Sequence, residues 1–348
     1  MKALVLTGKN EPLVLQERAD LRASAGEALV RIYAAALNHR DVWIQKGQYA
    51  GLKYPIVPGS DGAGVVVEMG GTESGTAGSW IGKEVIINPA LNWGDQASHQ
   101  DQQAFRILGL PDDGTFAEYV KVPVENLVEK PAHLSFEEAA ALPLAGVTAY
   151  RAVFTRAQLK RRSGSAGDRV AGAGEKVLIT GIGGGVALFA LQYAVAAGAQ
   201  VYVTSGSDEK INKAMALGAL GGVNYKKADW VENLRTLAGS FDVTIDGAAG
   251  DGMGELFDLA SPGGRVVFYG ATQGNPSGLV ARRIFWKQLD VLGSTMGSPK
   301  DFRSMIAFVR SQAIRPIVDK IFPFEEGAAA LQWMDDARQF GKIVIKVK

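Results

Sequence analysis

The sequence predicts an α/β protein in which a β-rich region precedes a doubly wound parallel sheet. Three observations support this prediction. Short apolar or alternating runs fill the chain up to about residue 150, the period then changes to that of a helix, and strands afterwards alternate with helices. The 348 residues are enough for two domains of ordinary size.

The first region reads as short strands separated by Gly, Pro and Asn. Its N-terminal stretch, MKALVLTGKNEPLVL, indicates one strand interrupted by polar residues, and EALVRIYAAALN, GAGVVVEMG, EVIINP and FAEYVKVP indicate further strands. A long polar insertion, Leu91–Gly114, separates two of these strands. Ser135 followed by Glu138 fits a capping box, which predicts a helix start at this point.

Strand–helix units follow a Gly-, Ser- and Ala-rich segment, Lys160–Glu175, which we expect to be flexible. The strand KVLITG precedes a helix over Val186–Ala197, and QVYVTS precedes a helix that ends at Gly218. GGVNY, FDVTIDGAAG and GGRVVFYG continue the strands, with helices between them. Units of this size imply a parallel sheet with helices on both faces. Beyond Pro299 two more helices alternate with two strands, the last being KIVIKVK.

Composition narrows the range of functions. The formal net charge of +1 gives no electrostatic reason to expect nucleic acid or an anionic membrane as a partner. The absence of Cys excludes disulfides, thiol nucleophiles and thiolate metal sites. No apolar run reaches the roughly 18 residues of a membrane-spanning helix, and the N-terminal stretch lacks the apolar core of a signal peptide. We therefore expect a cytoplasmic protein that acts on a small molecule.

The glycines between the strand KVLITG and the following helix are the strongest functional signal. Gly181, Gly183, Gly184 and Gly185 allow a tight turn with positive φ and a close approach of backbone N–H groups to a pyrophosphate. The helix that begins near Val186 directs its dipole and free N–H groups at the same charge. A tight turn without a ligand is the alternative, but the strand–helix units downstream favour dinucleotide binding.

The end of the second strand distinguishes the two nicotinamide dinucleotides. An NAD site typically has a carboxylate there for the ribose hydroxyls, whereas hydroxyls and an ammonium suit the 2′-phosphate of NADP. Ser205, Ser207 and Lys210 supply the second set and predict NADP(H). Asp208 is the counter-argument. We interpret it as an acidic residue at the start of the next helix.

Nearly the whole chain resembles the medium-chain dehydrogenase/reductase superfamily. The resemblance is carried by AAALNHRDVWIQKGQY, YPIVPGSDGAGVVVEMG, GTFAEYVKVP, LSFEEAAALPLAGVTAYRAV, GIGGGVALFALQYAVAAGA and GKIVIKV. It implies a GroES-like catalytic β domain over residues 1–146 and 300–348, a Rossmann domain over residues 147–299, and an active site in the cleft between them. It also implies a homodimer joined along the edge of the Rossmann sheet. The last glycine of the family's loop is Ala187 here, which still allows close helix–strand packing.

The zinc enzymes of this superfamily have ligands that the chain lacks. The resemblance aligns their catalytic Cys with Asn38, their His with Ser60 beside Asp61, and a further Cys or Asp near Leu144. Asn38, Ser60 and Leu144 do not make a tetrahedral zinc site. The four Cys of the structural zinc lobe are absent from Leu91–Gly114, where Asn92, Asp95, His99 and Asp101 read as solvated loop residues rather than as ligands. The chain therefore resembles the zinc-free branch, which contains quinone oxidoreductases and enoyl reductases.

Hydride transfer without a metal requires hydrogen-bond donors at the oxygen that gains negative charge. The resemblance assigns Asn38 to the nicotinamide ribose and places Trp43 and Tyr49 in the pocket. Tyr49 is the best candidate to donate to the substrate oxygen, and Trp43 forms a bulky wall. The alternative for both aromatic residues is packing under the cofactor. Asn38 and Asp41 also suit a turn after a strand, and His39 is either a proton donor or an exposed loop residue.

The remaining positions that match cofactor-facing residues of the family extend along the chain. They are Thr148, Gly184, Gly185, Val186, Ser205, Lys210, Tyr225, Tyr269, Gly270, Ala271 and Lys342. The function expected from these residues is NADPH-dependent reduction of a quinone or an α,β-unsaturated carbonyl. The alternatives are a metal-free carbonyl or alcohol dehydrogenase, and a dinucleotide-binding protein with little turnover.

Overall fold

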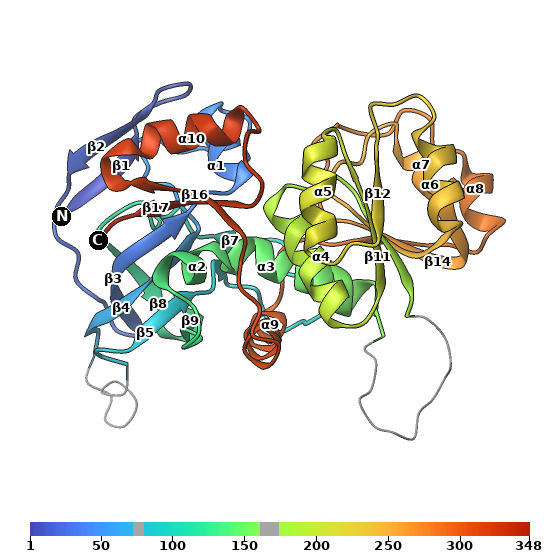
Figure 1. Ribbon diagram of the computed structural model, residues 1–348. Coiled ribbons are helices and arrows are strands. Elements are labelled where there is room, and N and C mark those ends of the chain that lie inside the picture. Colours follow the sequence, from blue (N-terminus) through green and yellow to red (C-terminus); the bar gives the residue numbers. More distant parts are fainter. Residues whose placement is uncertain (72–79, 161–173) are drawn as a thin grey trace, which may run out of the picture. The chain divides into compact units, whose positions relative to one another are not determined.

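The computed structural model describes residues 1–71, 80–160 and 174–348. The chain divides into two compact units, one of Met1–Val147 with Gly297–Lys348 and one of Thr148–Met296 (Figure 1). Both ends of the chain therefore build the first unit, and one continuous segment builds the second. Residues 161–173 of the segment expected to be flexible lie outside the described residues.

A seven-stranded sheet forms the first unit. Six of its strands lie in the order β16-β17-β3-β4-β5-β9, and β8 pairs with β3. β17 lies parallel to β16 and antiparallel to β3, so a strand from the C-terminal segment completes a sheet that the N-terminal segment begins. The strands are β3 (Glu27–Ala36), β4 (Asp61–Met69), β5 (Glu84–Ile87), β8 (Tyr119–Pro123), β9 (Leu127–Glu129), β16 (Val318–Pro323) and β17 (Lys342–Lys346).

The N-terminal stretch forms a hairpin rather than the single interrupted strand that the sequence indicated. β1 (Lys2–Leu6) and β2 (Leu13–Glu17) pair antiparallel, and the polar residues between them make the turn, where Asn10 has φ 62°. Leu4 and Leu6 of β1 join the apolar core of this unit, which also includes residues of β3, β8 and β17.

In the described residues, the first unit contains the helices α1 (His39–Gln45), α2 (Phe136–Ala141), α9 (Pro299–Ser311) and α10 (Gly327–Asp335), and α3 (Pro143–Tyr150) runs from the first unit into the second. The capping box predicted at the start of α2 is confirmed, because Glu138 N–H donates to Ser135 Oγ at 3.2 Å and Ser135 N–H donates to the Glu138 carboxylate at 2.9 Å. The sequence did not reveal α1, which is separated from the end of β3 by two residues. α3 runs into a π-helical segment, Arg151–Arg156.

The second unit holds a six-stranded, wholly parallel sheet in the order β12-β11-β10-β13-β14-β15. The strand order reverses between β10 and β13, which makes this sheet doubly wound as predicted. The strands are β10 (Lys176–Ile179), β11 (Gln200–Ser205), β12 (Gly221–Asn224), β13 (Phe241–Asp246), β14 (Ala260–Phe268) and β15 (Asp290–Gly293).

Helices cover both faces of this parallel sheet. α4 (Gly185–Ala196) and α5 (Asp208–Ala216) lie on one face, and α6 (Trp230–Ala238) and α7 (Met253–Leu259) lie on the other (Figure 1). α4 is apolar almost all round, because it packs between the sheet and the π-helical segment, where Tyr193 contacts Tyr150 and Phe154. The short helix α8 (Ala281–Phe285) and the edge strand β15 complete the unit.

The polar insertion Leu91–Gly114 carries a short ladder, β6 (Ala90–Leu91) with β7 (Arg106–Ile107), and a small aromatic core. Trp93 is 3% exposed, meets Phe105 edge-on at 5.4 Å between ring centroids, and donates from Nε1 to the Gln96 carbonyl oxygen. The Asp101 carboxylate accepts the backbone N–H groups of Gln103 and Ala104, both at 2.8 Å. Asp101 thus caps a turn. No three His, Asp or Glu side chains of the described residues group as metal ligands.

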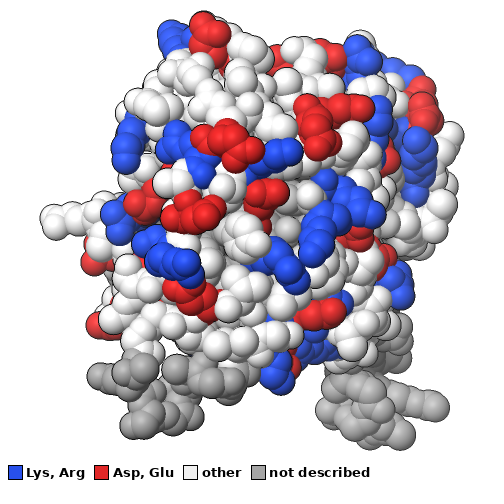
Figure 2. All heavy atoms as spheres, turned by 90° about the vertical axis from the view of Figure 1, so that its left-hand side faces the viewer, with Lys and Arg blue, Asp and Glu red and all other residues white. Residues whose placement is uncertain are grey.

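Charge is mixed over the surface of the first unit. Figure 2 shows acidic and basic side chains interspersed on the face of the molecule that was on the left in Figure 1, where β1 and β2 lie. Ion pairs such as that between the N-terminal ammonium of Met1 and Asp20 Oδ1, at 2.9 Å, contribute to this pattern. Among the described helices none is long and apolar enough to cross a membrane.

Candidate functional site

The sheet of the first unit brings together polar residues from three distant parts of the chain. β3 lies between β4 and β17, and its last residue, Ala36, pairs with Asp61 on one side and with Val344 on the other. Asn38, which follows β3, therefore lies beside the start of β4 and the start of β17. Asp61 and Lys342 occupy those two starts.

A buried network joins these residues. Lys342 Nζ donates to the Leu37 carbonyl oxygen at 2.7 Å, to Asn38 Oδ1 at 2.6 Å and to Asp61 Oδ2 at 3.1 Å. Asn38 Nδ2 also donates to Asp61 Oδ2, and the Leu144 backbone N–H donates to Asp61 Oδ1. Burial raises the pKa of the Asp61 carboxyl, and the Lys342 ammonium counteracts that rise. The network fixes both ends of the Asn38 amide.

Asp41 ties the first turn of α1 to Asn38. Its Oδ2 accepts the Asn38 backbone N–H at 2.8 Å, whereas its buried Oδ1 has no hydrogen-bond partner in the described part of the chain. Burial raises the pKa of Asp41 to about 6, against the opposing effect of the Arg40 guanidinium. Asn38 and Asp41 are therefore the N-cap and a first-turn residue of α1. The sequence had suggested a turn after a strand as one alternative for these two residues.

Arg40 is a site residue that the sequence did not single out. It lies buried on α1, and Nη1 donates to Ser60 Oγ at 2.5 Å and to the Leu108 carbonyl oxygen at 2.7 Å. In the sequence Arg40 looks like an ordinary exposed cation in a turn after a strand. The available signal was its place within NHRD, next to residues that the resemblance assigned to the site.

The residues at the positions of the zinc ligands do not fit a zinc ion. Asn38 and Asp61 are bound to the Lys342 ammonium, and Ser60 is bound to the Arg40 guanidinium. Two fixed positive side chains at this place oppose a divalent cation, and Leu144 contributes only its backbone N–H. We therefore derive no chemical step through zinc.

The two aromatic residues expected in the pocket both belong to the first unit. Trp43 lies on α1, half-buried, with its ring 6.1 Å from the exposed His39 ring. Tyr49 follows α1, is half-buried, and its ring lies 5.0 Å from Arg40 Cζ. The Tyr49 hydroxyl has no hydrogen-bond partner among the described residues, whereas the nearby Tyr54 hydroxyl donates to the Ile44 carbonyl oxygen. Tyr49 thus has a donor available for a ligand.

In the second unit, the glycine loop between β10 and α4 forms a cradle. Gly181 and Gly183 have φ of 62° and 120°, which L side chains rarely adopt, so glycine is required there. Gly184 is the N-cap of α4, and no side chain from the described residues caps the helix. A Cβ added at Gly181 meets nothing within 4 Å, and one at Gly184 meets only the Gly181 carbonyl oxygen at 3.9 Å. Open space in front of uncapped N–H groups suits a phosphate.

The polar residues after β11 gather at one edge of this loop. Lys210 reaches back toward it, because a Cβ added at Gly183 would lie 3.5 Å from Lys210 Nζ. A Cβ added at Gly206 would lie 2.9 Å from the Tyr225 hydroxyl oxygen. Ser205 is buried and donates to the Ile182 carbonyl oxygen, and Ser207 Oγ accepts the Lys210 backbone N–H as the cap of α5.

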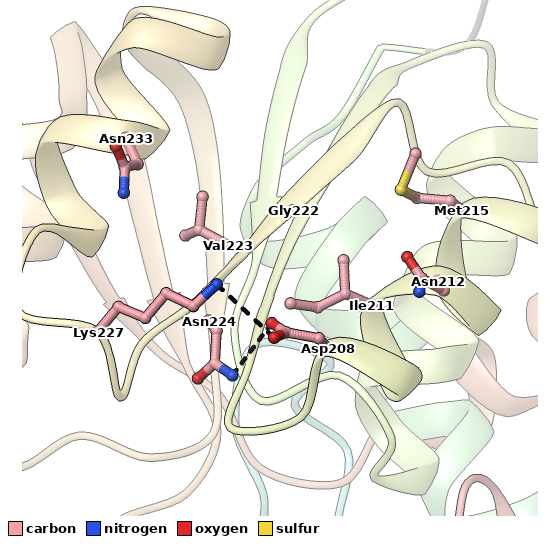
Figure 3. Close-up of a pocket in the computed structure, with 9 residues that line it drawn as sticks. All are labelled: Asp208, Ile211, Asn212, Met215, Gly222, Val223, Asn224, Lys227 and Asn233. Carbon is pink, nitrogen blue, oxygen red and sulfur yellow. Dashed lines mark hydrogen bonds and ion pairs between the residues drawn. The ribbon is translucent and has the colours of Figure 1, made fainter.

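Asp208 is engaged by a different set of residues. Its carboxylate accepts from Asn224 Nδ2 at 3.1 Å and lies 3.6 Å from Lys227 Nζ. Figure 3 shows these contacts in a pocket of about 260 Å³ between α5, β12 and α6, which Ile211, Asn212, Met215, Gly222, Val223 and Asn233 also line. Asp208 is the first residue of α5, as the sequence predicted.

The remaining candidates of this unit follow the carboxyl end of β14 or lie on α3. Tyr269, Gly270 and Ala271 come directly after β14, and a Cβ added at Gly247 would lie 2.6 Å from the Tyr269 hydroxyl oxygen. Burial and the Asp246 carboxylate raise the pKa of the Tyr269 phenol, which therefore stays protonated. Thr148 lies on α3 and is 5% exposed. In open α/β sheets ligands bind at the carboxyl ends of the strands.

Comparison with known proteins identifies the family of both parts of the chain. Residues 24–132 match the alcohol dehydrogenase GroES-like domain, and residues 185–311 match the zinc-binding dehydrogenase family. The zinc-type alcohol dehydrogenase-like protein YogA of Leptosphaeria maculans is 35% identical over 97% of this chain and 95% of its own length. An acryloyl-coenzyme A reductase of Metallosphaera sedula is 28% identical over 99% of both chains.

A solved structure has the same fold. The crystal structure of an NAD-dependent alcohol dehydrogenase covers 100% of both chains with a TM-score of 0.89 and 36% sequence identity. The GroES-like domain and the Rossmann-type parallel sheet expected from the sequence are thereby confirmed. With relatives of this identity along its whole length, the chain belongs to the medium-chain dehydrogenase/reductase superfamily of oxidoreductases.

Proposed function

We propose that this protein is an NADPH-dependent oxidoreductase that transfers a hydride to a quinone or an α,β-unsaturated carbonyl without zinc. The observation that carries the proposal is that cationic side chains occupy the place where zinc enzymes of the superfamily would bind their metal. Arg40 and Lys342 bind the side chains at these positions, and in the second unit the open space at Gly181 before the start of α4 supports dinucleotide binding. A quinone or an enone needs less polarisation than a simple carbonyl, because its anion is delocalised.

The preference for NADP rests on the charges after β11. Ser207, Tyr225 and the Lys210 ammonium offer donors near the glycine loop and the turn after β11, and a 2′-phosphate suits such a set. Ser205 holds this turn in place, because its hydroxyl donates to the Ile182 carbonyl oxygen and accepts the Ser207 backbone N–H. In an NAD site a carboxylate near this position accepts hydrogen bonds from the ribose hydroxyls. Here the Asp208 carboxylate is engaged by Asn224 and Lys227 (Figure 3). The related structure described as NAD-dependent makes NADH the alternative to be tested.

Near the reacting ring, we assign Asn38 to the nicotinamide ribose. One hydrogen of its Nδ2 is bound to Asp61, and the other is free to donate to a ribose hydroxyl. Lys342 uses three N–H donors inside the first unit, so we assign it to holding Asn38 and Asp61 rather than to a cofactor phosphate. Tyr269, Gly270, Ala271 and Thr148 remain candidates for cofactor contacts.

When bound, the cofactor supplies a hydride, and the protein supplies a donor for the acceptor oxygen. The Tyr49 hydroxyl is available for this role, since no described residue accepts from it. Trp43 forms a wall of the same pocket. The relative that reduces acryloyl-coenzyme A, an α,β-unsaturated thioester by name, supports an activated alkene as the acceptor class. Relatives named alcohol dehydrogenases keep a carbonyl or an alcohol as the second candidate.

We also propose a homodimer joined along β15. This strand ends the parallel sheet, and the segment before it exposes Leu279, Val280, Phe285 and Trp286, the last at 73%. An unpaired sheet edge beside exposed apolar side chains favours pairing with a second copy.

Cofactor titration followed by an acceptor screen tests the function. We expect the wild-type protein to bind NADPH more tightly than NADH and to oxidise it with quinones or enones. Lys210→Ala should weaken NADPH binding about 10- to 100-fold and NADH binding much less, because only NADPH carries the extra phosphate. Lys213→Ala, one turn along α5 and paired with Glu209 at 2.7 Å, is the matched control. Equal losses for the two cofactors would contradict the cofactor assignment, and turnover of alcohols alone would favour the second candidate.

A further inference from the structure

Arg40 is a buried cation whose hydrogen-bond partners are all neutral. It is 5% exposed, and its two Nη atoms contact Ser60 Oγ and the carbonyl oxygens of Leu108 and Ile107, the last at 3.4 Å. Its Nε is buried and has no hydrogen-bond partner in the described part of the chain. The hydrogen bonds of the guanidinium therefore all go to neutral groups, and the neighbouring Asp41 carboxyl interacts with its charge only through space.

A buried guanidinium usually faces a carboxylate, because moving an unpaired charge out of water is unfavourable. The two carboxylates of the site are engaged elsewhere. Asp61 pairs with Lys342 at 3.1 Å, and Asp41 Oδ2 accepts the Asn38 backbone N–H. No carboxylate of the described residues forms an ion pair with Arg40. Arg40 therefore forms no direct ion pair in the described residues, and its charge acts through space on the groups around it, among them Asp41 and the Tyr49 ring.

The Tyr49 ring is the group through which that charge can act. Arg40 Cζ lies 5.0 Å from the ring centroid, within the range of a cation–π contact. Such a contact holds the ring in place. It also favours negative charge on the phenol oxygen, because the cation attracts electron density that moves onto the ring. A phenol in this setting donates a stronger hydrogen bond than one beside neutral groups.

We propose that Arg40 is a positioning residue of the acceptor site, which fixes the Tyr49 ring and strengthens its hydrogen bond to the acceptor oxygen. The inference rests on the function proposed above. The β-carbon of an unsaturated carbonyl gains a hydride as the C4–H bond of the bound nicotinamide breaks and the ring is oxidised. The carbon–carbon π pair then moves toward the carbonyl oxygen, where Tyr49 donates, and a proton from water completes the product at the α-carbon.

A purely structural role for Arg40 is the competing explanation, because its contacts with Ile107 and Leu108 also anchor the polar insertion. Both explanations predict that loss of Arg40 lowers stability. Only the positioning role predicts that the effect of Arg40 on kcat depends on the Tyr49 hydroxyl. A double-mutant cycle therefore separates them.

The experiment compares full-length wild-type protein with Arg40→Met, Tyr49→Phe and the combination, using NADPH with 2-cyclohexen-1-one and with a quinone. We expect each single substitution to lower kcat about tenfold or more, with the Kd for NADPH little changed. The combination should be no slower than Tyr49→Phe alone. Tyr54→Phe, which removes a hydroxyl bound to the Ile44 carbonyl oxygen, is the control and should leave kcat within about twofold.

Arg40→Lys keeps a cation and serves if Arg40→Met does not fold. Its loss in kcat should also vanish in the Tyr49→Phe background. Equal fold-losses from the Arg40 substitutions with and without the Tyr49 hydroxyl would overturn the inference and leave Arg40 as an anchor. If the wild-type protein oxidises NADPH with neither the enone nor the quinone, the proposed function is overturned and this inference with it. That outcome is distinct from an active enzyme in which the Arg40 and Tyr49 substitutions act independently.

Discussion

Asp41 lies fully buried next to Arg40, yet one of its carboxylate oxygens has no hydrogen-bond partner in the described residues. Burial raises its pKa from 3.8 to about 6. The folded protein therefore holds this proton more tightly than the unfolded chain does. The linkage relation then requires the free energy of unfolding to fall as pH rises from about 4 through about 6, and this contribution levels off above that range.

Asp41→Asn tests this linkage. The amide oxygen keeps the hydrogen bond from the Asn38 backbone N–H but removes the charge. We expect the free energy of unfolding of the variant, relative to wild type, to rise by about 2.4 kcal/mol between about pH 4 and about pH 8. Urea denaturation at the two pH values measures it, with Asp335→Asn, an exposed carboxylate paired with Lys46, as the control. A difference that does not change with pH would contradict the raised pKa.

At the scale of elements, the insertion Leu91–Gly114 shows how a polar lobe without cysteines is held together. Trp93 and Phe105 make its core, and Asp101 fixes its turn. Composition predicted only a polar loop, because two aromatic residues among many polar ones give no periodic pattern. Helix α1 escaped prediction for a related reason. It has only seven residues, and the polar residues that begin it also suit a turn.

Trp93→Ala should lower the free energy of unfolding by about 3 kcal/mol or more, because it removes a large buried side chain and leaves a cavity. Trp93→Phe should cost less, since it loses the bond to the Gln96 carbonyl oxygen but retains a ring against Phe105. Chemical denaturation of both variants measures the difference. A loss within error for Trp93→Ala would show that the lobe does not depend on this core.

On the scale of the whole molecule, local patterns in the sequence predicted the structural features that are formed by residues close together in the chain. The glycine loop, the helix caps and the alternation of the second unit are of this kind. The network around Asn38 is not, because Lys342 is 304 residues away and only the sheet brings the two together. The sequence placed both residues in the site through resemblance alone. It gave no sign that Lys342 would bind Asn38 or that Arg40 would bind Ser60.

The assembly proposed along β15 also belongs to this scale. We expect the wild-type protein to have twice the mass of one chain by light scattering after size exclusion. Trp286→Ser with Phe285→Ser should shift it toward the monomer, because both side chains are largely exposed, at 73% and 63%, beside the edge strand. Ile321→Ser, which changes an exposed apolar residue of the first unit, should not. A wild-type monomer would exclude the dimer.

The place of β17 in the sheet also constrains how the protein is made. Residues 342–346 leave the ribosome after the second unit, yet they pair with Ala34–Ala36 of β3 and bring the counter-ion of Asp61. Until then a nascent chain has an open strand edge and an unneutralised carboxylate in the region of its future site. The parallel sheet can fold during synthesis, but the first unit must wait for its closing strand, and we expect chaperones to attend the chain over that interval.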